Sequence, residues 1–404
     1  MFQKFRGRNI TEAFPSQFWV MVVGLFISSA GASMIWPFMM IYASEKLNLT
    51  LSTVSTLITV NAVVGLFASF IAGAVADKVG RKPVMVVSLA VNGLSYFFMS
   101  YANSYLEFAI IMVFMGASNP LYQVGSDAML ADLISSEKRS RAFAIIRMIN
   151  NAGIAIGPAV GGFVAAHSYS AAFICAAIGM LCYSMLLLFK AHETLDKKYH
   201  EGIVSWKRTL SEYGLVFKDH SYLIFALLIG LGLIAPSMLW TLLSVYTKQN
   251  FGLPENLYGW LPTTNALMCV LVQYPITHLF RKNHPLSTIT LGVFAYALGV
   301  GSVFFMHSFW GFWTSMVLMT MGELILLPTA SKYIADRAPE DMRGRYMSFY
   351  WFAWGIARGV APLIGGFMND KISPQSIWLA ALAIGLTSTL GLLVYNSRRI
   401  DKLV

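Results

Sequence analysis

Charged residues are scarce in this sequence. Asp, Glu, Lys and Arg make up only 12% of its 404 residues, whereas 57% are hydrophobic. Soluble domains have about 25% charged residues, and so small a share of charge cannot cover a surface that faces water. We therefore expect most of the surface to face lipid, which excludes an ordinary soluble protein.

Cysteine is also rare, and the signatures of cofactor chemistry are missing. The sequence has no Gly-x4-Gly-Lys-Ser/Thr segment, so nothing indicates ATP hydrolysis. It has no His-Glu-x-x-His segment and no Cys pair for a metal. No polar region is long enough for a catalytic domain, so we expect no cofactor and no enzyme activity. The three cysteines lie inside apolar runs and are read as small buried side chains: Cys175, Cys182 and Cys269.

Long apolar runs are abundant instead. Ser221 to Tyr246 and Ser170 to Phe189 contain no Asp, Glu, Lys or Arg. About 20 such residues cross a bilayer as a helix, and the uniform apolar character favours helices over a barrel. The sequence predicts an all-α membrane protein with twelve transmembrane helices, at 17–43, 52–76, 83–101, 105–132, 142–166, 169–190, 221–246, 256–280, 285–307, 309–335, 346–369 and 374–397.

The basic residues set the expected orientation. The net charge of +10 comes from short clusters of Lys and Arg between apolar runs, a distribution that does not indicate nucleic acid as a partner. These clusters fall mainly in the segments on the same side as the N-terminus. Because cytoplasmic loops are enriched in Lys and Arg, we expect both termini in the cytoplasm of a multi-pass protein of the cell membrane.

The two halves of the sequence repeat each other at a shift of 204 residues. The segment Ser33 to Trp36 falls on Ser237 to Trp240, and Pro158-x-x-Gly161-Gly162 falls on Pro362-x-x-Gly365-Gly366. Thr59, Asn61 and Ala62 likewise fall on Thr263, Asn265 and Ala266. We predict two parallel six-helix repeats with a site between them near the middle of the membrane. The expected domains are a first bundle at 1–190, a cytoplasmic linker at 191–220 and a second bundle at 221–404.

Two motifs in the first half suggest moving parts. The loop after the second span would turn tightly at a glycine and place an acid beside three cations. In the fifth span, a proline bends the helix and glycines admit a close neighbour. The alternatives are a loop that only sets topology and a kink that only aids packing. The motifs are Gly73-x-x-x-Asp77-Lys78-x-Gly80-Arg81-Lys82-Pro83 and Gly153-x-x-x-Gly157-Pro158-x-x-Gly161-Gly162.

These motifs resemble those of the major facilitator superfamily along essentially the whole chain. The motif of the fifth span is similar to that of the family's antiporters, especially the drug:proton group, although Met112 stands where that group usually has Arg. The resemblance implies a monomer that works by alternating access, with protons and a small molecule as partners. It also implies that Asp77 meets the start of the eleventh span and that Arg81 pairs with Asp132, which latches the cytoplasmic side.

Four ionisable residues lie inside predicted spans: Asp127, Arg147, Glu323 and Arg358. Charge there is costly and usually functional. At about 1.5 Å per residue, Asp127 and Arg147 lie roughly 8 and 9 Å deep, and Glu323 and Arg358 lie roughly 20 Å deep. Each acid thus matches a base on the next antiparallel helix. The alternative reading is two static ion pairs. Our hypothesis is that Glu323 is the main proton-coupling carboxylate and attracts cationic substrates.

The candidate substrate-binding residues are Trp36, Trp240, Asn61, Asn265, Gln123 and Glu323. The two Trp residues occupy equivalent repeat positions and could stack on flat apolar molecules, although placement at the membrane interface is an equal alternative. We predict proton-coupled export of lipophilic or cationic compounds. The alternatives are a transporter of one metabolite, a sensor or scaffold without flux and, less favoured, a membrane-embedded enzyme.

Overall fold

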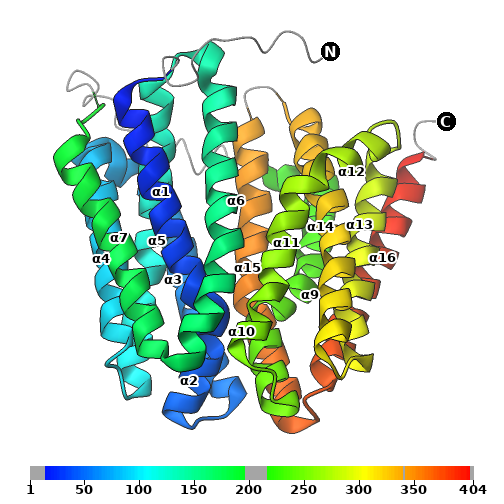
Figure 1. The fold of residues 1–404 in the computed structure, drawn as a ribbon. Helices are drawn as coiled ribbons and strands as arrows, with labels where there is room; N and C mark the ends of the chain where they lie inside the picture. The colour runs from blue at the N-terminus through cyan, green and yellow to red at the C-terminus, as the bar shows by residue number, and fades with distance from the viewer. Residues whose placement is uncertain (1–13, 196–215, 340–341, 401–404) are drawn as a thin grey trace.

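The computed structural model describes residues 14–195, 216–339 and 342–400. All regular secondary structure in this part of the chain is helical (Figure 1). The helices are α1 (Ser16–Ile35), η2 (Trp36–Phe38), α2 (Met39–Leu47), α3 (Leu51–Val79), α4 (Arg81–Met99), α5 (Tyr105–Leu133), α6 (Ser136–His167), α7 (Tyr169–Lys190), α9 (His220–Phe251), α10 (Glu255–Tyr258), α11 (Trp260–Leu271), α12 (Gln273–Phe280), α13 (Pro285–Gly301), η4 (Ser302–Phe305), α14 (Phe309–Arg337), α15 (Arg343–Lys371) and α16 (Ser376–Ile400).

The helices of the described residues correspond to the twelve predicted spans. Ten helical segments are long and apolar enough to cross a membrane. The other two predicted spans coincide with α10–α12 and with α15. The first of these is broken at Gly259 and at Val272 into three short helices, and the second carries Arg358 inside its apolar stretch. Of the linker predicted at 191–220, residues 196–215 lie outside the described part of the chain.

Proline marks a break in the first span but not in the seventh. The turn of 3₁₀-helix η2 contains Pro37, which cannot donate a hydrogen bond to the preceding turn. Asn48 ends α2 in the left-handed conformation, with φ of 50°. In contrast, α9 continues through Pro236 without interruption. The repeated segments around Trp36 and Trp240 therefore differ in backbone form.

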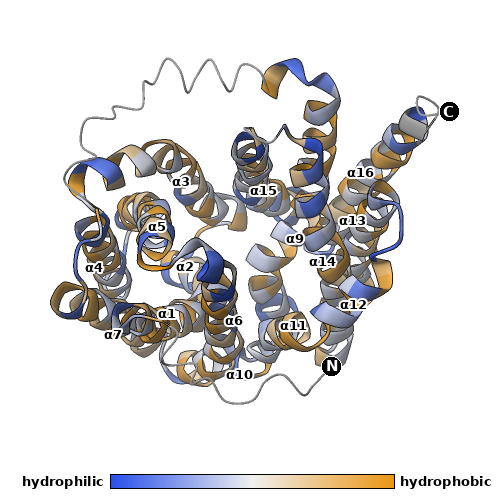
Figure 2. Cartoon of the chain, turned by 90° about the horizontal axis from the view of Figure 1, so that it is seen from above, coloured by the Kyte–Doolittle hydropathy of each residue, from blue (hydrophilic) through white to orange (hydrophobic). Residues whose placement is uncertain are grey.

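The helices form two groups that stand side by side. Figure 2 shows α1–α7 on one side and α9–α16 on the other. We call these the first and the second group. Large apolar side chains such as Phe189, 75% exposed, and Leu227, 70% exposed, lie on the perimeter. Such a surface is stable in contact with lipid.

The two groups meet along two seams. One seam joins α3 to α15, and the other joins α6 to α10 and α11 (Figure 2). In Figure 1, α1 begins at the upper end of the bundle, and α2 lies at the lower end. We use upper end and lower end in this sense.

Candidate functional site

A pair of repeat-related hydrogen bonds crosses the two seams. The Thr59 hydroxyl on α3 donates to the carbonyl oxygen of Gly359 on α15, at 2.7 Å. The Thr263 hydroxyl on α11 donates to the carbonyl oxygen of Ala155 on α6, at 2.8 Å. Thr59 and Thr263 are equivalent in the 204-residue repeat, and so are Ala155 and Gly359. The repeat thus organises the contact between the groups as well as the groups themselves.

Removing these hydroxyls one at a time should loosen the lower end by similar amounts. We expect Thr59→Val and Thr263→Val each to raise the equilibrium constant for opening of the lower end about two- to tenfold. The reason is that one buried hydrogen bond contributes about 0.5–1.5 kcal/mol. The measurement is the labelling rate of a cysteine placed at Ser55, which is fully buried at the seam, in a background without the native cysteines. Unequal effects would contradict the equivalence of the two bonds.

Glycines bring the backbones of the two groups into contact. A Cβ at Gly162 on α6 would overlap the backbone of Glu255, and a Cβ at Gly366 on α15 would overlap Ser52. These two contacts are again related by the repeat shift. A Cβ at Gly259 would overlap the carbonyl of Pro158. The seams therefore depend on positions that only glycine fills without displacement.

The remaining glycines of the motif in the fifth span pack α6 against α1. A Cβ at Gly153 or Gly157 would overlap a serine side chain of α1, and a Cβ at Gly161 would overlap the Met34 backbone. The motif thus has two faces, one toward α1 within the first group and one, through Pro158 and Gly162, toward the second group.

Polar contacts close the lower end. Glu255, only 4% exposed, accepts a hydrogen bond from the Tyr169 hydroxyl of the first group and pairs with Lys248 at 2.9 Å. The backbone N–H of Ser52 donates to Asp370 Oδ2 at 2.8 Å. A further bond runs from Gln249 Nε2 to Ser44 Oγ, at 3.0 Å. Sequence reasoning missed these residues because they lie at helix ends, where no periodic pattern marks them.

Acid should weaken the contact at Glu255. Burial by itself would raise the pKa of this carboxyl, but the bonds from Tyr169 and Lys248 outweigh burial and hold the pKa below its ordinary value of 4.5. A lowered pKa stabilises the folded protein above 4.5, and this stabilisation is lost as pH falls through the lowered value. We expect the unfolding temperature to fall in that range, and Glu255→Gln to remove this part of the pH dependence. Glu137→Gln, at an exposed acid, is the control that should leave it unchanged.

The upper end shows part of the expected latch. Arg81 forms an ion pair with Asp132. Gly80 has φ of 106°, a conformation that favours glycine, so the turn there is tight as expected. The carboxylate of Glu193, which sequence reasoning did not single out, accepts the backbone N–H groups of Arg81 and Lys82 at 3.2 and 3.0 Å. This carboxylate caps the start of α4.

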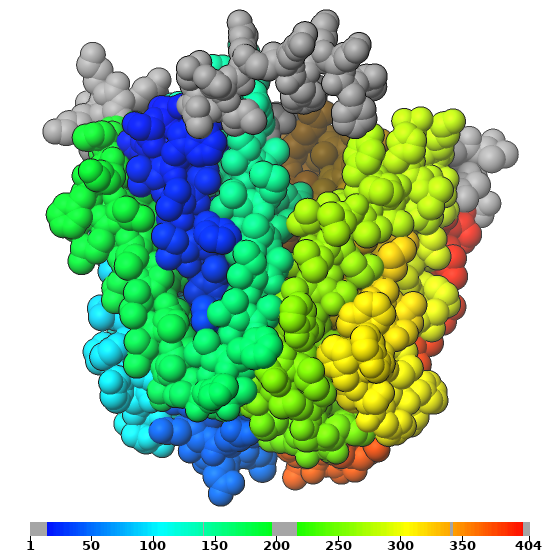
Figure 3. Space-filling view, in the orientation of Figure 1, coloured from blue at the N-terminus to red at the C-terminus, as the bar shows by residue number. Residues whose placement is uncertain are grey.

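The other half of the expected latch is not formed in this structure. Asp77 is exposed and makes no hydrogen bond to α15 within the described residues. A Cβ at Gly73 would meet nothing within 4 Å. Figure 3 shows the surface hollowed at the upper end between α6 and the yellow-green helices, with α15 set back behind them. The groups are therefore joined at the lower end and separated at the part of the upper end where the latch was expected.

Three polar residues lie along one side of α5, and one of them, Asn119, accepts a hydrogen bond from Asn92 Nδ2 of α4 at 3.1 Å. Asn119, Gln123 and Asp127 are exposed and follow one another at intervals of four residues, on the face opposite the apolar residues Ile110 and Phe114. Gln123 Nε2 donates to both oxygens of Asp127, at 3.2 and 3.1 Å. This stripe presents a carboxylate to the space between the groups.

Glu323 lies in the corresponding part of the second group. Its side chain is partly exposed, and its Oε2 accepts a hydrogen bond from Asn265 Nδ2 at 2.8 Å. Asn265 also donates to Thr320 Oγ1 at 3.0 Å. The charge of Arg147, on α6 of the first group, acts on Glu323 and on Cys269 of α11. The two side chains come from different groups, and they form no ion pair among the described residues.

The two ion pairs expected from depth are not formed. Among the described residues, Asp127 has Gln123 as its partner, not Arg147, and Glu323 has Asn265, not Arg358. Depth along a helix fixes height but not the direction in which a side chain points. Arg147 belongs to α6, which packs against α11 of the other group, and its charge acts on Glu323 and not on Asp127.

The remaining candidate residues contact other parts of the protein. Asn61 Nδ2 donates to the carbonyl oxygen of Met112 at 3.1 Å and so ties α3 to α5. Trp36 and Trp240 are half-buried and pack against the apolar core. Neither Trp residue makes a hydrogen bond that would orient it toward a bound molecule within the described part of the chain.

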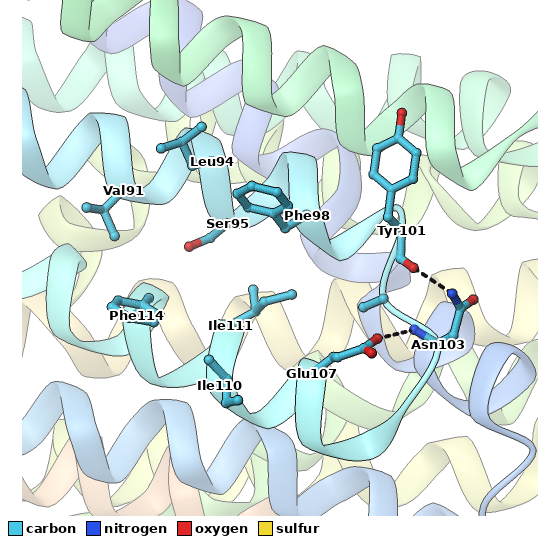
Figure 4. Close-up of a pocket in the computed structure, with 11 residues that line it drawn as sticks. Val91, Leu94, Ser95, Phe98, Tyr101, Asn103, Glu107, Ile110, Ile111 and Phe114 are labelled. Atoms are coloured by element: carbon cyan, nitrogen blue, oxygen red, sulfur yellow. Dashed lines mark hydrogen bonds between the residues drawn. The ribbon is translucent and has the colours of Figure 1, made fainter.

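A separate groove lies on the perimeter between α4 and α5 (Figure 4). It has a volume of about 560 Å³ and is lined by apolar side chains such as Leu94, Phe98 and Phe114. Its polar end holds Glu107, which accepts the backbone N–H of Asn103 at 2.7 Å and caps α5. Because it lies apart from Asp127, Glu323 and both seams, the groove is not part of the candidate site.

Known proteins resemble this chain over nearly its full length. The model of the Major Facilitator Superfamily matches residues 21–246 and 231–402. A Na(+), Li(+), K(+)/H(+) antiporter of Planococcus maritimus is 27% identical over 85% of this chain and 87% of its own length. The quinolone resistance protein NorA of Staphylococcus aureus is 23% identical over 95% and 97%. The solved structure of the nucleoside transporter NupG has a TM-score of 0.80 at 12% identity, covering 94% of this chain and 99% of that one, and shares the fold.

Proposed function

The chain belongs to the Major Facilitator Superfamily, and from this premise we propose that it is a proton-coupled antiporter that exports lipophilic or cationic compounds. It is a multi-pass membrane protein of a transporter family. Two relatives support the proposal of proton-coupled export, because one is named as a cation/H(+) antiporter and the other as a quinolone resistance protein. We further propose two domains, 1–190 and 221–404, in the cell membrane with both termini in the cytoplasm, acting as a monomer.

Alternating access gives the seams their role. If the upper end faces the cytoplasm, the described conformation is closed to the outside and open toward the cytoplasm. Opening to the outside would break the bonds of Thr59, Thr263 and Glu255. Closing the cytoplasmic side would bring Asp77 to the start of α15, where the positive end of the helix dipole favours an anion. The pair Arg81–Asp132 would hold the loop in position for this contact.

The observation that carries proton coupling is the position of Glu323. It is a partly exposed acid in the interior of α14, and the charge of Arg147 on the opposite group acts on it. Rocking of the groups changes the separation between this carboxyl and the guanidinium. Because a nearby cation and access to water both alter how tightly a carboxyl holds its proton, the motion would bind and release protons on alternate sides. Asp127 is proposed as a second interior acid that helps attract cationic substrates.

The test is transport by the purified protein in liposomes with an imposed pH gradient. We expect gradient-driven movement of a fluorescent lipophilic cation. Exchange of Na⁺, Li⁺ or K⁺ for protons without dye movement would favour an inorganic cation antiporter instead. Uptake of a single metabolite, or no flux with any substrate, would overturn the export proposal and favour a dedicated transporter or a sensor.

A further inference from the structure

Arg358 lies on the interior face of α15. The exposed apolar residues Ile356, Val360 and Phe367 define the face of α15 that meets lipid. Arg358 is two residues from Ile356 and from Val360, which corresponds to a rotation of about 200° around the helix. Its exposed side chain is therefore directed away from lipid. Trp351, 57% exposed and seven residues earlier, lies on the same face.

The neighbouring helices confirm this direction. Gly359 contacts α3 through Thr59, and Gly365 packs against Leu242 of α9. The face of α15 between these two contacts is turned toward the interior space, which α3 borders from the first group and α9 from the second (Figure 2). The guanidinium of Arg358 thus projects into the same interior that holds Glu323 and the polar stripe of α5.

The charge of Arg358 is not matched by the protein. Within the described part of the chain, Arg358 makes no hydrogen bond and no ion pair. The two interior acids differ, since Asp127 is bound by Gln123 and Glu323 is bound by Asn265, and the charge of Arg147 acts on Glu323. A cation inside a membrane protein is costly and is normally matched by an anion. When the protein supplies none, a mobile anion is the remaining partner.

We propose that Arg358 is the binding site for a carboxylate of the transported molecule. The substrate class is then a lipophilic zwitterion, with its carboxylate at Arg358 and its cationic end toward Asp127. A guanidinium presents paired donors that match a carboxylate, and the exposed ring of Trp351 offers a flat surface to the apolar body. This inference rests on the proposed export function and adds a substrate group that the export proposal alone does not require.

Two dyes that differ only at the carboxyl group test the inference. Rhodamine B carries a free carboxylate, and its ethyl ester does not. In liposomes with an imposed pH gradient, we expect Arg358→Gln to lower transport of rhodamine B about 10- to 100-fold, the range of a hydrogen bond between charged groups. Transport of the ester should change less than threefold. Arg358→Lys should restore part of the rhodamine B transport, and Arg398→Gln, at an exposed Arg near the end of α16, is the matched control.

Binding provides a second measurement that does not depend on turnover. Quenching of tryptophan fluorescence in detergent should give weaker binding of rhodamine B, but not of the ester, to Arg358→Gln. Equal losses for both dyes would overturn the inference, because Arg358 would then act in structure or coupling. Transport of the ester but not of rhodamine B by the unaltered protein would overturn it while leaving the export proposal standing. Failure to move either dye would count against export itself.

Discussion

Glu323→Gln should abolish pH-driven export while leaving substrate exchange intact. The amide keeps the size of the side chain and can still bond to Asn265, but it cannot take up and release a proton. We expect gradient-driven dye accumulation to fall at least about tenfold, because the coupling step loses its proton carrier. Counterflow of labelled against unlabelled dye, which needs no proton movement, should change little. The measurement compares both activities in the same liposome preparation.

The matched control for this variant is Glu107→Gln. Glu107 is likewise a carboxyl on a long helix, but it caps the start of α5 at the perimeter, away from the interior acids. The control should keep its gradient-driven transport. Full pH-driven export by Glu323→Gln would contradict the coupling role, and loss of counterflow as well would indicate that Glu323 acts in substrate binding instead.

Gly259→Val should hold the lower end open and stop transport. A Cβ at this position would overlap the carbonyl of Pro158 on α6, so the α6–α11 seam cannot close without displacing the backbone. Forcing extra atoms into such a contact costs about 1–3 kcal/mol, enough to move the equilibrium between conformations about 5- to 150-fold. We expect a cysteine at Ser55 to react much faster with a membrane-impermeant thiol reagent added from the lower side, and dye export to fall about tenfold or more.

Gly344→Val makes the same chemical change where space is free. A Cβ at Gly344, in the first turn of α15, would meet nothing within 4 Å. This variant should leave the labelling rate close to that of the unaltered protein. The control concerns labelling and not export, because the start of α15 is where Asp77 is proposed to dock. Slow labelling of Ser55→Cys in the Gly259→Val background would show that the lower end still closes, and would contradict the role of this seam.

The sequence predicted the plan of the molecule well because that plan depends on patterns that repeat. Apolar length placed the spans, and the 204-residue shift related the two groups. The same shift aligned Thr59 with Thr263 before any contact was known, although it did not reveal that both donate across the seams. The break at Val272 was not foreseen, although Pro275 has no N–H to bond to the carbonyl of Leu271 and so interrupts the helix at this point.

The interior charges were predicted individually but paired incorrectly. Residue numbers give the height of Arg147 and Arg358 along their helices, but the partner depends on how α6 and α15 are rotated and on which neighbour they face. The charge of Arg147 acts on Glu323 of the other group, and Arg358 forms no ion pair within the described residues. The contacts of Glu255 could not be predicted either, because they join three helix ends that are distant in the sequence.

The repeat-related threonine bonds have a consequence for how the protein moves. Each bond ties the same two rigid bodies, one on either flank of the interior, so parting one flank while the other stays joined would twist both bodies about their long axes. Side chains packed at crystal-like density resist such torsion. We therefore expect both flanks to release in one concerted event, which leaves half-parted forms sparsely populated and makes the passage between conformations switch-like.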